Sequence, residues 1–377
     1  MLKEIEIQNF RCFEQIKISG FERVNLIGGK NNAGKTALLE AIFLYKYPDC
    51  RSIFALKTLR RESSELREWR EPIEPIESIE PIELIQPSSK RGWENFFYSL
   101  NKDAAIVIQG KDERNVIHKT EICLDESGNV NNIFADHNVE RLRDYFLKDQ
   151  DDLLVLNIKS NRDNQENVQS VIIATSSTQH WLGSGPNLYE PPFIASCMRS
   201  LGADLMELFD LARLDDKYRE VLKAFQVLDS SIESVESFSI GEPTLYLRRK
   251  GEKRLPLSLF GDAINRVAEI ILKVVNSQYQ ILLIDEIENG IHYTSQREFW
   301  RFLFRLAVEL DTQIFATTHS LEMLQAFADV GLEPNQECSS AYFEMAKKWK
   351  TDQIIGIRRD LETLNYALEH QEGVRGE

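Results

Sequence analysis

The sequence predicts an α/β fold built around a phosphate-binding loop, and three features carry this prediction. Residues 29–36 read GKNNAGKT and match the pattern G-x-x-x-x-G-K-[ST] in full. The apolar run at 24–27 before the loop is typical of a short buried strand, and residues 36–43 after it have helical spacing. Strand and helix patterns then alternate between 261 and 328, which predicts a parallel sheet.

The loop is expected to bind the phosphates of a nucleoside triphosphate. Its glycines let the main chain curl so that consecutive N–H groups face a phosphate, and the helix N-terminus adds partial positive charge. Lys35 is expected to reach the β- and γ-phosphates, and Thr36 to offer its hydroxyl to Mg²⁺. The residues predicted to contact ATP in this segment are Gly29, Asn31, Asn32, Ala33, Gly34, Lys35 and Thr36.

Two later strands end in polar residues that are expected at the same crevice. The apolar run 280–284 is followed by Asp285 and Glu286. We expect Asp285 to hold Mg²⁺ through water and Glu286 to act as the general base on the attacking water. The strand predicted at 312–316 precedes His319, which is expected to sense the γ-phosphate. The alternative for His319 is a packed or capping residue before the next helix.

A third segment predicts a second chain in the site. Ser258 and Gly261 precede a helix expected at 261–275, and together they form another helix end suited to a γ-phosphate. One chain cannot place two such helix ends on opposite sides of one phosphate, so a second copy is expected to supply Ser258. The alternative is an ordinary capping box for that helix.

Composition restricts the class of protein. The chain has 377 residues, a net charge of −15 and 42% hydrophobic residues, as expected of a globular, acidic protein. This balance argues against a surface broadly coated by nucleic acid. Its five cysteines are scattered without a C-x-x-C pair, and no apolar run approaches the length of a membrane span. We therefore expect a cytoplasmic protein without a membrane partner.

The same patterns predict the domain organisation. Residues 1–46 and 245–377 are assigned to the ATPase core, and 93–190 to a β-rich part of its N-lobe. Residues 47–92 are assigned to an inserted charged helix and a linker with a Pro-Ile-Glu repeat, and 191–244 to a helical lid. The three-residue period of the repeat suits polyproline II and a docking strip, but an extended or disordered linker is the simpler interpretation.

These segments, in this order, resemble the ABC-type ATPases of the SMC/RecF/OLD class. The opening run 5–13 is similar to that class's first strand and "NFR" turn; Arg11 matches a position that usually reaches the nucleotide, and Asn31 matches the loop asparagine. The stand-alone, OLD-like prokaryotic AAA family ATPases are the most similar group, through 255–262, 283–293 and 315–320. Ala263 departs from the group's usual glycine. The resemblance implies a mixed N-lobe sheet, and a parallel core sheet flanked by helices with a helical insertion.

The resemblance also implies a function. Members of this group are regulatory ATPases of antiphage defence that dimerise around Mg-ATP, hydrolyse it to ADP and phosphate, and work with a separate effector, for example a Toprim-type nuclease. No nuclease pattern is evident in this sequence, which favours a separately encoded effector. The alternative is a RecF-like DNA-binding ATPase of DNA repair, for which DNA contacts would come from basic patches at 57–61, 67–70 and 248–254. Acidic residues flank the first two patches, so solvated helix faces are the simpler interpretation.

Overall fold

The computed structural model describes residues 1–60, 91–125, 154–162, 165–174, 179–182, 192–196, 202–260, 262–276, 280–334 and 336–370. The chain forms two structural units. The core unit comprises Met1, 19–39 and 192–377, and the N-lobe unit comprises 2–18 and 40–191. The boundary between them falls inside α1 (Lys35–Lys46). The Pro-Ile-Glu repeat lies outside the described residues.

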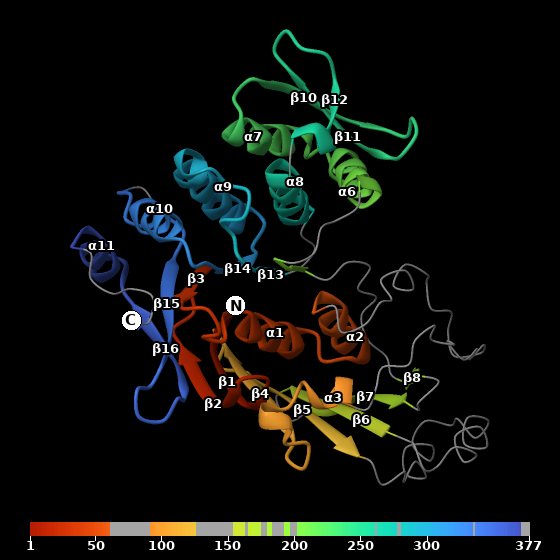
Figure 1. Cartoon of the computed structure of the whole chain (residues 1–377), viewed down its shortest axis with the longest axis vertical. Coiled ribbons are helices and arrows are strands. Elements are labelled where there is room, and N and C mark those ends of the chain that lie inside the picture. Colours follow the sequence, from red (N-terminus) through yellow and green to blue (C-terminus); the bar gives the residue numbers. More distant parts are fainter. Residues whose placement is uncertain are drawn as a thin grey trace. The chain divides into compact units, whose positions relative to one another are not determined.

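The core unit is built on a six-stranded sheet in the order β16-β15-β3-β14-β13-β9 (Figure 1). Five of these strands run parallel, and β16 pairs antiparallel with β15 at one edge. Strands β3, β13 and β14 are buried along their whole length, which explains why their sequences are mostly apolar. The strand bounds are β3 (Val24–Gly29), β9 (Phe193–Ile194), β13 (Ile281–Ile284), β14 (Gln313–Thr317), β15 (Ser340–Lys347) and β16 (Ile354–Arg359).

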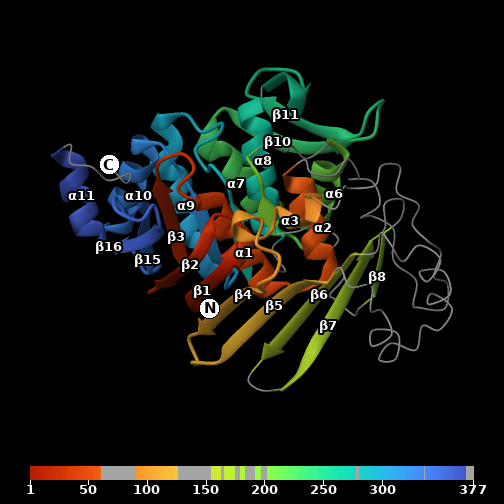
Figure 2. The ribbon, with the colours of Figure 1, turned by 60° about the horizontal axis from the view of Figure 1, so that its bottom comes forward.

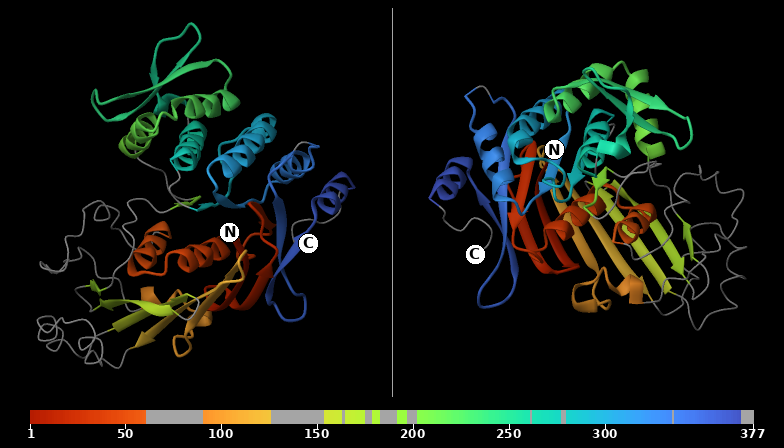
Figure 3. Two further views of the ribbon diagram at one scale, coloured as in Figure 1. Left: turned by 180° about the vertical axis from the view of Figure 1, so that it is seen from behind. Right: turned by 45° about the horizontal axis from the view of Figure 1, so that its top comes forward.

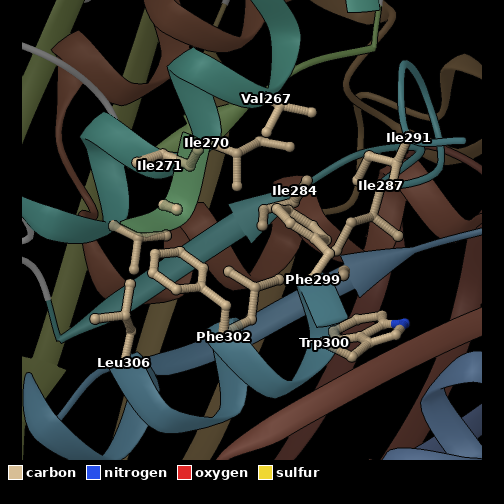
Figure 4. Packing of buried hydrophobic residues seen from close by; sticks show 14 of the residues in the cluster. Val267, Ile270, Ile271, Ile284, Ile287, Ile291, Phe299, Trp300, Phe302 and Leu306 are labelled. Carbon is tan, nitrogen blue, oxygen red and sulfur yellow. The ribbon is translucent and has the colours of Figure 1, made fainter. Parts of the chain in front are cut away.

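Amphipathic helices cover this sheet. Figure 4 shows side chains of α8 (Asp262–Val275) and α9 (Gln296–Glu309) meeting around Ile284 of β13. Most of these side chains are almost completely buried, so the packing fixes β13, and with it the acids that follow, between two helices. The other helices of the unit are α6 (Gly202–Leu214), α7 (Tyr218–Leu228), α10 (Leu321–Gly331) and α11 (Leu361–Glu369), with short 3₁₀ turns η4 (Leu257–Phe260) and η5 (Tyr293–Ser295).

The segment 191–244, which the sequence analysis assigned to a helical lid, has several structural roles. Residues 202–228 form α6 and α7, but β9 joins the core sheet. The last part begins a three-stranded antiparallel sheet of β10 (Ile232–Phe238), β11 (Thr244–Arg249) and β12 (Leu255–Pro256). Each of these elements belongs to the core unit.

Two glycines at the end of β3 are required by the neighbouring strand. A Cβ on Gly28 would lie 2.3 Å from the Tyr342 hydroxyl, and one on Gly29 would lie 2.4 Å from the backbone oxygen of Met345. Gly29 also has a φ of 144°, which L side chains rarely adopt. Strand β15 therefore approaches β3 so closely that only glycine fits at positions 28 and 29, where the chain enters the phosphate loop.

The N-lobe unit contains a seven-stranded sheet in the order β2-β1-β4-β5-β6-β7-β8 (Figure 2). Neighbours from β1 to β8 along this order pair antiparallel. The bounds are β1 (Leu2–Phe10), β2 (Phe13–Ser19), β4 (Ile106–Asp112), β5 (Ile117–Asp125), β6 (Leu154–Arg162), β7 (Gln165–Ala174) and β8 (Gln179–Leu182), with helices α2 (Cys50–Leu59), α3 (Arg91–Glu94) and the 3₁₀ turn η2 (Tyr98–Leu100). Across the described ranges, no helix is both long and apolar enough to cross a bilayer.

Candidate nucleotide-binding site

The predicted phosphate loop connects β3 to α1 in the core unit. Asn32 and Gly34 have φ angles of 61° and 85°, so the chain turns through left-handed conformations inside the loop. The Gly34 carbonyl then accepts a 2.9 Å hydrogen bond from the Leu38 N–H, which starts the helix. Asn31 and Asn32 are exposed on the loop, whereas Ala33 is buried. The unpaired N–H groups of a helix N-terminus are thereby presented at the loop, as anion binding requires.

Lys35 folds back over this loop. Its ammonium donates to the carbonyl oxygens of Gly29 at 2.8 Å and Lys30 at 3.0 Å. Burial lowers the pKa of Lys35, while the negative charges of nearby Asp285, Glu288 and Glu286 act in the opposite direction. The cation therefore lies beside both the loop and the carboxylates that follow β13.

Asp285 is bound by hydroxyl groups from three separate segments. The residue is 4% exposed, and its carboxylate accepts hydrogen bonds from Thr36 at 3.1 Å, Thr317 at 2.6 Å and Ser196 at 3.1 Å. A carboxylate and a threonine hydroxyl form an all-oxygen donor set that suits a hard cation such as Mg²⁺. In the described part of the chain, no group of three or more His, Cys, Asp or Glu side chains could hold a metal.

A buried arginine fixes the backbone around Asp285. Arg266 of α8 donates to the carbonyl oxygens of Ala195 at 2.6 Å, Asp285 at 2.8 Å and Ile194 at 3.2 Å. The guanidinium thus joins the carboxyl ends of β9 and β13. The sequence did not predict the contacts of Arg266 and Ser196; α8 also carries Asn265, Glu269 and Lys273, so its pattern does not single out Arg266.

Glu286 adopts a left-handed backbone conformation with φ of 52°. Such strain costs about 1–3 kcal/mol in a residue other than glycine and collects at functional positions. Its N–H donates to the Thr317 hydroxyl at 2.8 Å, and its carboxylate accepts from the Asn289 amide at 2.9 Å. These contacts fix both the backbone and the carboxylate of Glu286.

Glu288 holds His319, and the sequence analysis missed this contact. One carboxylate oxygen, Oε1, accepts a hydrogen bond from the backbone N–H of His319 at 2.9 Å and lies 3.1 Å from the ring nitrogen Nδ1 of His319. Glu288 is 11% exposed at its side chain, whereas the His319 side chain is 47% exposed. The helix cap is supplied by the next residue, because the Ser320 hydroxyl accepts the Met323 N–H at 3.1 Å. His319 is therefore anchored on its Nδ1 side.

Three further predicted site residues are Ser258, Gly261 and Arg11. Ser258 is exposed on η4 beside Leu259, and within the described residues no hydrogen bond or ion pair links Ser258 to the phosphate loop. Gly261 lies outside the described residues. Arg11 belongs to the N-lobe unit, where its guanidinium pairs with Glu40 at 2.9 Å and donates to the Asn95 carbonyl at 3.0 Å.

Several residues of the basic patches considered for DNA contact make contacts within the protein. Three arginines of the 248–254 patch form ion pairs with carboxylates: Arg248 with Glu233, Arg249 with Asp229, and Arg254 with Glu236. The hydrogen bond from Arg254 lowers the pKa of Glu236. In the 57–61 patch, Lys57 is buried with its ammonium 3.8 Å from the Trp93 ring centre, and Arg60 pairs with Glu40. The 67–70 patch lies outside the described residues.

The strand–loop–helix segment carrying Lys35, with acids after β13 and a histidine after β14, defines a P-loop NTPase. The chain belongs to the family described as "AAA domain, putative AbiEii toxin, Type IV TA system", whose model matches residues 24–324. This membership confirms the AAA family ATPase predicted from the sequence.

Individual relatives extend the comparison. Over 400 residues, covering 100% of both proteins, the chain is 22% identical to a Helicobacter pylori protein named "ATP/GTP phosphatase". A 47-residue stretch, 12% of this chain and 5% of the relative, is 47% identical to the "DNA double-strand break repair Rad50 ATPase" of Archaeoglobus fulgidus. Among solved structures, the SMC head domain from Thermotoga maritima is similar over 95% of this chain and 99% of that chain, with 12% identity and a TM-score of 0.40.

Proposed function

We propose that the chain binds Mg-ATP at the loop of residues 29–36 and hydrolyses it to ADP and phosphate. The observation that carries this proposal is the convergence of Lys35, Thr36 and Asp285, with a strained Glu286 next in sequence. The name of the full-length relative, an ATP/GTP phosphatase, supports the same reaction. The loop N–H groups and the Lys35 ammonium bind the β- and γ-phosphates.

Each remaining residue has a proposed part in hydrolysis. Thr36 and Asp285 hold Mg²⁺, which neutralises charge on the phosphate oxygens when it is bound. Glu286 accepts the proton of the attacking water. His319 contacts the γ-phosphate through Nε2, because Glu288 occupies its Nδ1 side. Glu288 is thus a positioning residue for His319.

A second copy of the chain completes the site in this proposal. The Ser258 hydroxyl of one copy faces the phosphate loop of the other, and Gly261 allows the close approach. Two features of η4 support this role. Leu257 is buried and anchors the turn, while Ser258 and the neighbouring Leu259, which is 69% exposed, face outward. Arg11 is proposed to reach the nucleotide, as the resembling ATPases suggest. The active assembly is a homodimer or a higher homo-oligomer.

The wider role that we propose is regulatory. The dimer state of this OLD-like ATPase controls a separately encoded effector, a Toprim-type or other nuclease, in prokaryotic antiphage defence in the cytoplasm. The family description names a putative AbiEii toxin and a Type IV TA system, and this name supports a role in a defence system of this kind.

Phage plating tests the defence role. Cells that carry the gene with its native neighbours should plate a panel of phages less efficiently than cells carrying Lys35→Ala in the same locus, because the variant cannot bind the nucleotide that drives the switch. The readout is plaque number at matched protein abundance. Equal plating of every phage on both strains would contradict the defence role, and it would leave ATP hydrolysis by the purified protein as a separate question.

DNA repair is the weaker candidate for this site. Its support from the 248–254 patch is reduced, because the arginines there are already paired with carboxylates. The paired carboxylates offset part of the positive charge that phosphate binding requires.

A further inference from the structure

The turn between β15 and β16 carries an unusual combination of exposed residues. We call residues 347–353 the hairpin tip; they read KKWKTDQ. Trp349 is 94% exposed there, against 80% for Leu214 and Ile240, the next most exposed large hydrophobic residues in the described chain. Tryptophan normally buries most of its large ring, so an isolated ring in solvent is a candidate contact surface.

The hairpin tip is ordered by its own backbone. The Lys348 N–H donates to the Gln353 carbonyl at 2.9 Å, and the Lys348 carbonyl accepts the N–H groups of Thr351 at 3.2 Å and Asp352 at 3.0 Å. Asp352 completes the turn with φ of 53°. These bonds hold Trp349 at the outer end of the turn, so a ligand would meet a ring whose backbone is already fixed.

Three lysines lie within two residues of Trp349 in the sequence. Lys347, Lys348 and Lys350 are exposed, and within the described part of the chain none has a carboxylate oxygen within 4.0 Å of its ammonium. They differ in this from the arginines of the 248–254 patch, which are paired. On a chain with a net charge of −15, the hairpin tip is therefore a local site of available positive charge.

The hairpin tip extends from the edge of the core sheet that carries the phosphate loop. Strand β15 runs parallel to β3, and Met345 pairs with Gly29, the first residue of the loop. The tip begins two residues later. Figure 3 shows the turn at the end of the hairpin opposite α10 and α11, which belong to the same unit. The hairpin tip thus follows β15, and β15 pairs with β3, the strand that leads into the candidate nucleotide site.

We propose that the hairpin tip binds single-stranded nucleic acid, with a base stacked on Trp349 and neighbouring phosphates bound by the three lysines. Any base can stack on a tryptophan ring, and lysines beside it neutralise the backbone, so this pairing suits binding without sequence preference. The site is separate from the ATP site and does not depend on the proposed hydrolysis.

Two other partners, a bilayer surface and a protein, suit the hairpin tip less well than a nucleic acid does. A bilayer surface would meet a single apolar side chain, on a turn that also carries the polar Thr351 and the acidic Asp352. One such ring gives little insertion into an interface. A protein partner would normally need a broad apolar patch around the anchor residue, whereas the neighbours of Trp349 on the turn are charged or polar.

Fluorescence anisotropy with a labelled oligothymidine tests the proposal. The full chain is titrated without nucleotide and in EDTA, so that any failure of ATP binding or hydrolysis leaves this measurement unaffected. Trp349→Ala should weaken binding about 10- to 100-fold, the loss of one stacked base. Replacing Lys347, Lys348 and Lys350 by Glu should remove binding. The wild-type salt slope should include about −2 from three phosphate contacts.

The control makes the same kind of charge reversal, at two lysines instead of three, on the other basic turn. Lys250→Glu with Lys253→Glu alters two exposed lysines between β11 and β12 and should leave oligothymidine binding within about twofold. All variants alter exposed side chains, and unchanged thermal melting verifies their folding. The proposal is overturned if Trp349→Ala binds as tightly as wild type. It is also overturned if the protein binds phosphatidylserine vesicles but no oligothymidine. The same holds if Mg-ATP changes the fluorescence of Trp349 and oligothymidine does not bind.

Discussion

Lys35→Ala is expected to abolish nucleotide binding. The ammonium already makes two hydrogen bonds with loop carbonyls, at 2.8 Å and 3.0 Å, where the phosphates are proposed to bind. Each hydrogen bond from this ammonium to a phosphate oxygen would contribute about 1.5–3 kcal/mol, so losing two such bonds weakens ATP binding at least about 100-fold. Isothermal titration calorimetry with ATP and Mg²⁺ measures the change directly.

The control for this variant lies in the same loop. Lys30 carries the same charge, but its side chain is exposed, and only its carbonyl contacts the Lys35 ammonium. Lys30→Ala should therefore keep ATP affinity within about threefold, as expected for an exposed charge. ATP affinity of Lys35→Ala equal to that of wild type would show that the loop is not the phosphate site.

Glu286→Gln is expected to bind ATP and fail to hydrolyse it. The amide keeps the shape of the side chain but cannot accept the proton of the attacking water, and general-base catalysis contributes about 10²- to 10⁴-fold. The ATP-bound dimer should therefore accumulate. Single-turnover phosphate release measures the chemical step, and light scattering in ATP measures the dimer. Release at the wild-type rate would exclude Glu286 as the base.

Glu288→Gln, two residues further along, separates positioning from base catalysis. It keeps a group that can contact His319 but removes the charge beside Nδ1. We expect kcat to fall about tenfold, as for a second residue that orients a site ligand, with KM unchanged and the pH dependence of kcat altered. A variant with the kcat and pH profile of wild type would show that Glu288 does not position His319.

The sequence predicted those parts of the site that lie in continuous segments. The phosphate loop, the acids after β13 and the histidine after β14 each follow a buried apolar strand, and parallel strands bring their carboxyl ends to one edge. Asp285 and Thr36 are 249 residues apart and lie in hydrogen-bond contact, as this topology requires. For these residues, local pattern and global fold lead to the same arrangement.

The contacts that tertiary packing creates could not be predicted in this way. Ser196 reaches Asp285 from a segment 89 residues earlier, beside a two-residue strand that gives no pattern of its own. Glu288 meets His319 because its segment turns back against β14, where Thr317 binds both Asp285 and the Glu286 N–H. The pairing of Arg248 with Glu233 likewise depends on the register of β10 and β11, and it changes a basic patch into an ion-paired surface.

Mixing two inactive variants tests most directly whether two chains form each site. Lys35→Ala removes the loop cation, and Ser258→Arg blocks the serine-bearing turn; each alone should show little phosphate release. In a mixed dimer, the intact loop of the Ser258→Arg chain faces the intact serine of the Lys35→Ala chain, so one complete site forms. The account predicts that ATP hydrolysis returns on mixing. Wild-type hydrolysis by Ser258→Arg alone, or no recovery in mixtures that light scattering shows to contain dimers, would contradict a site shared between two chains.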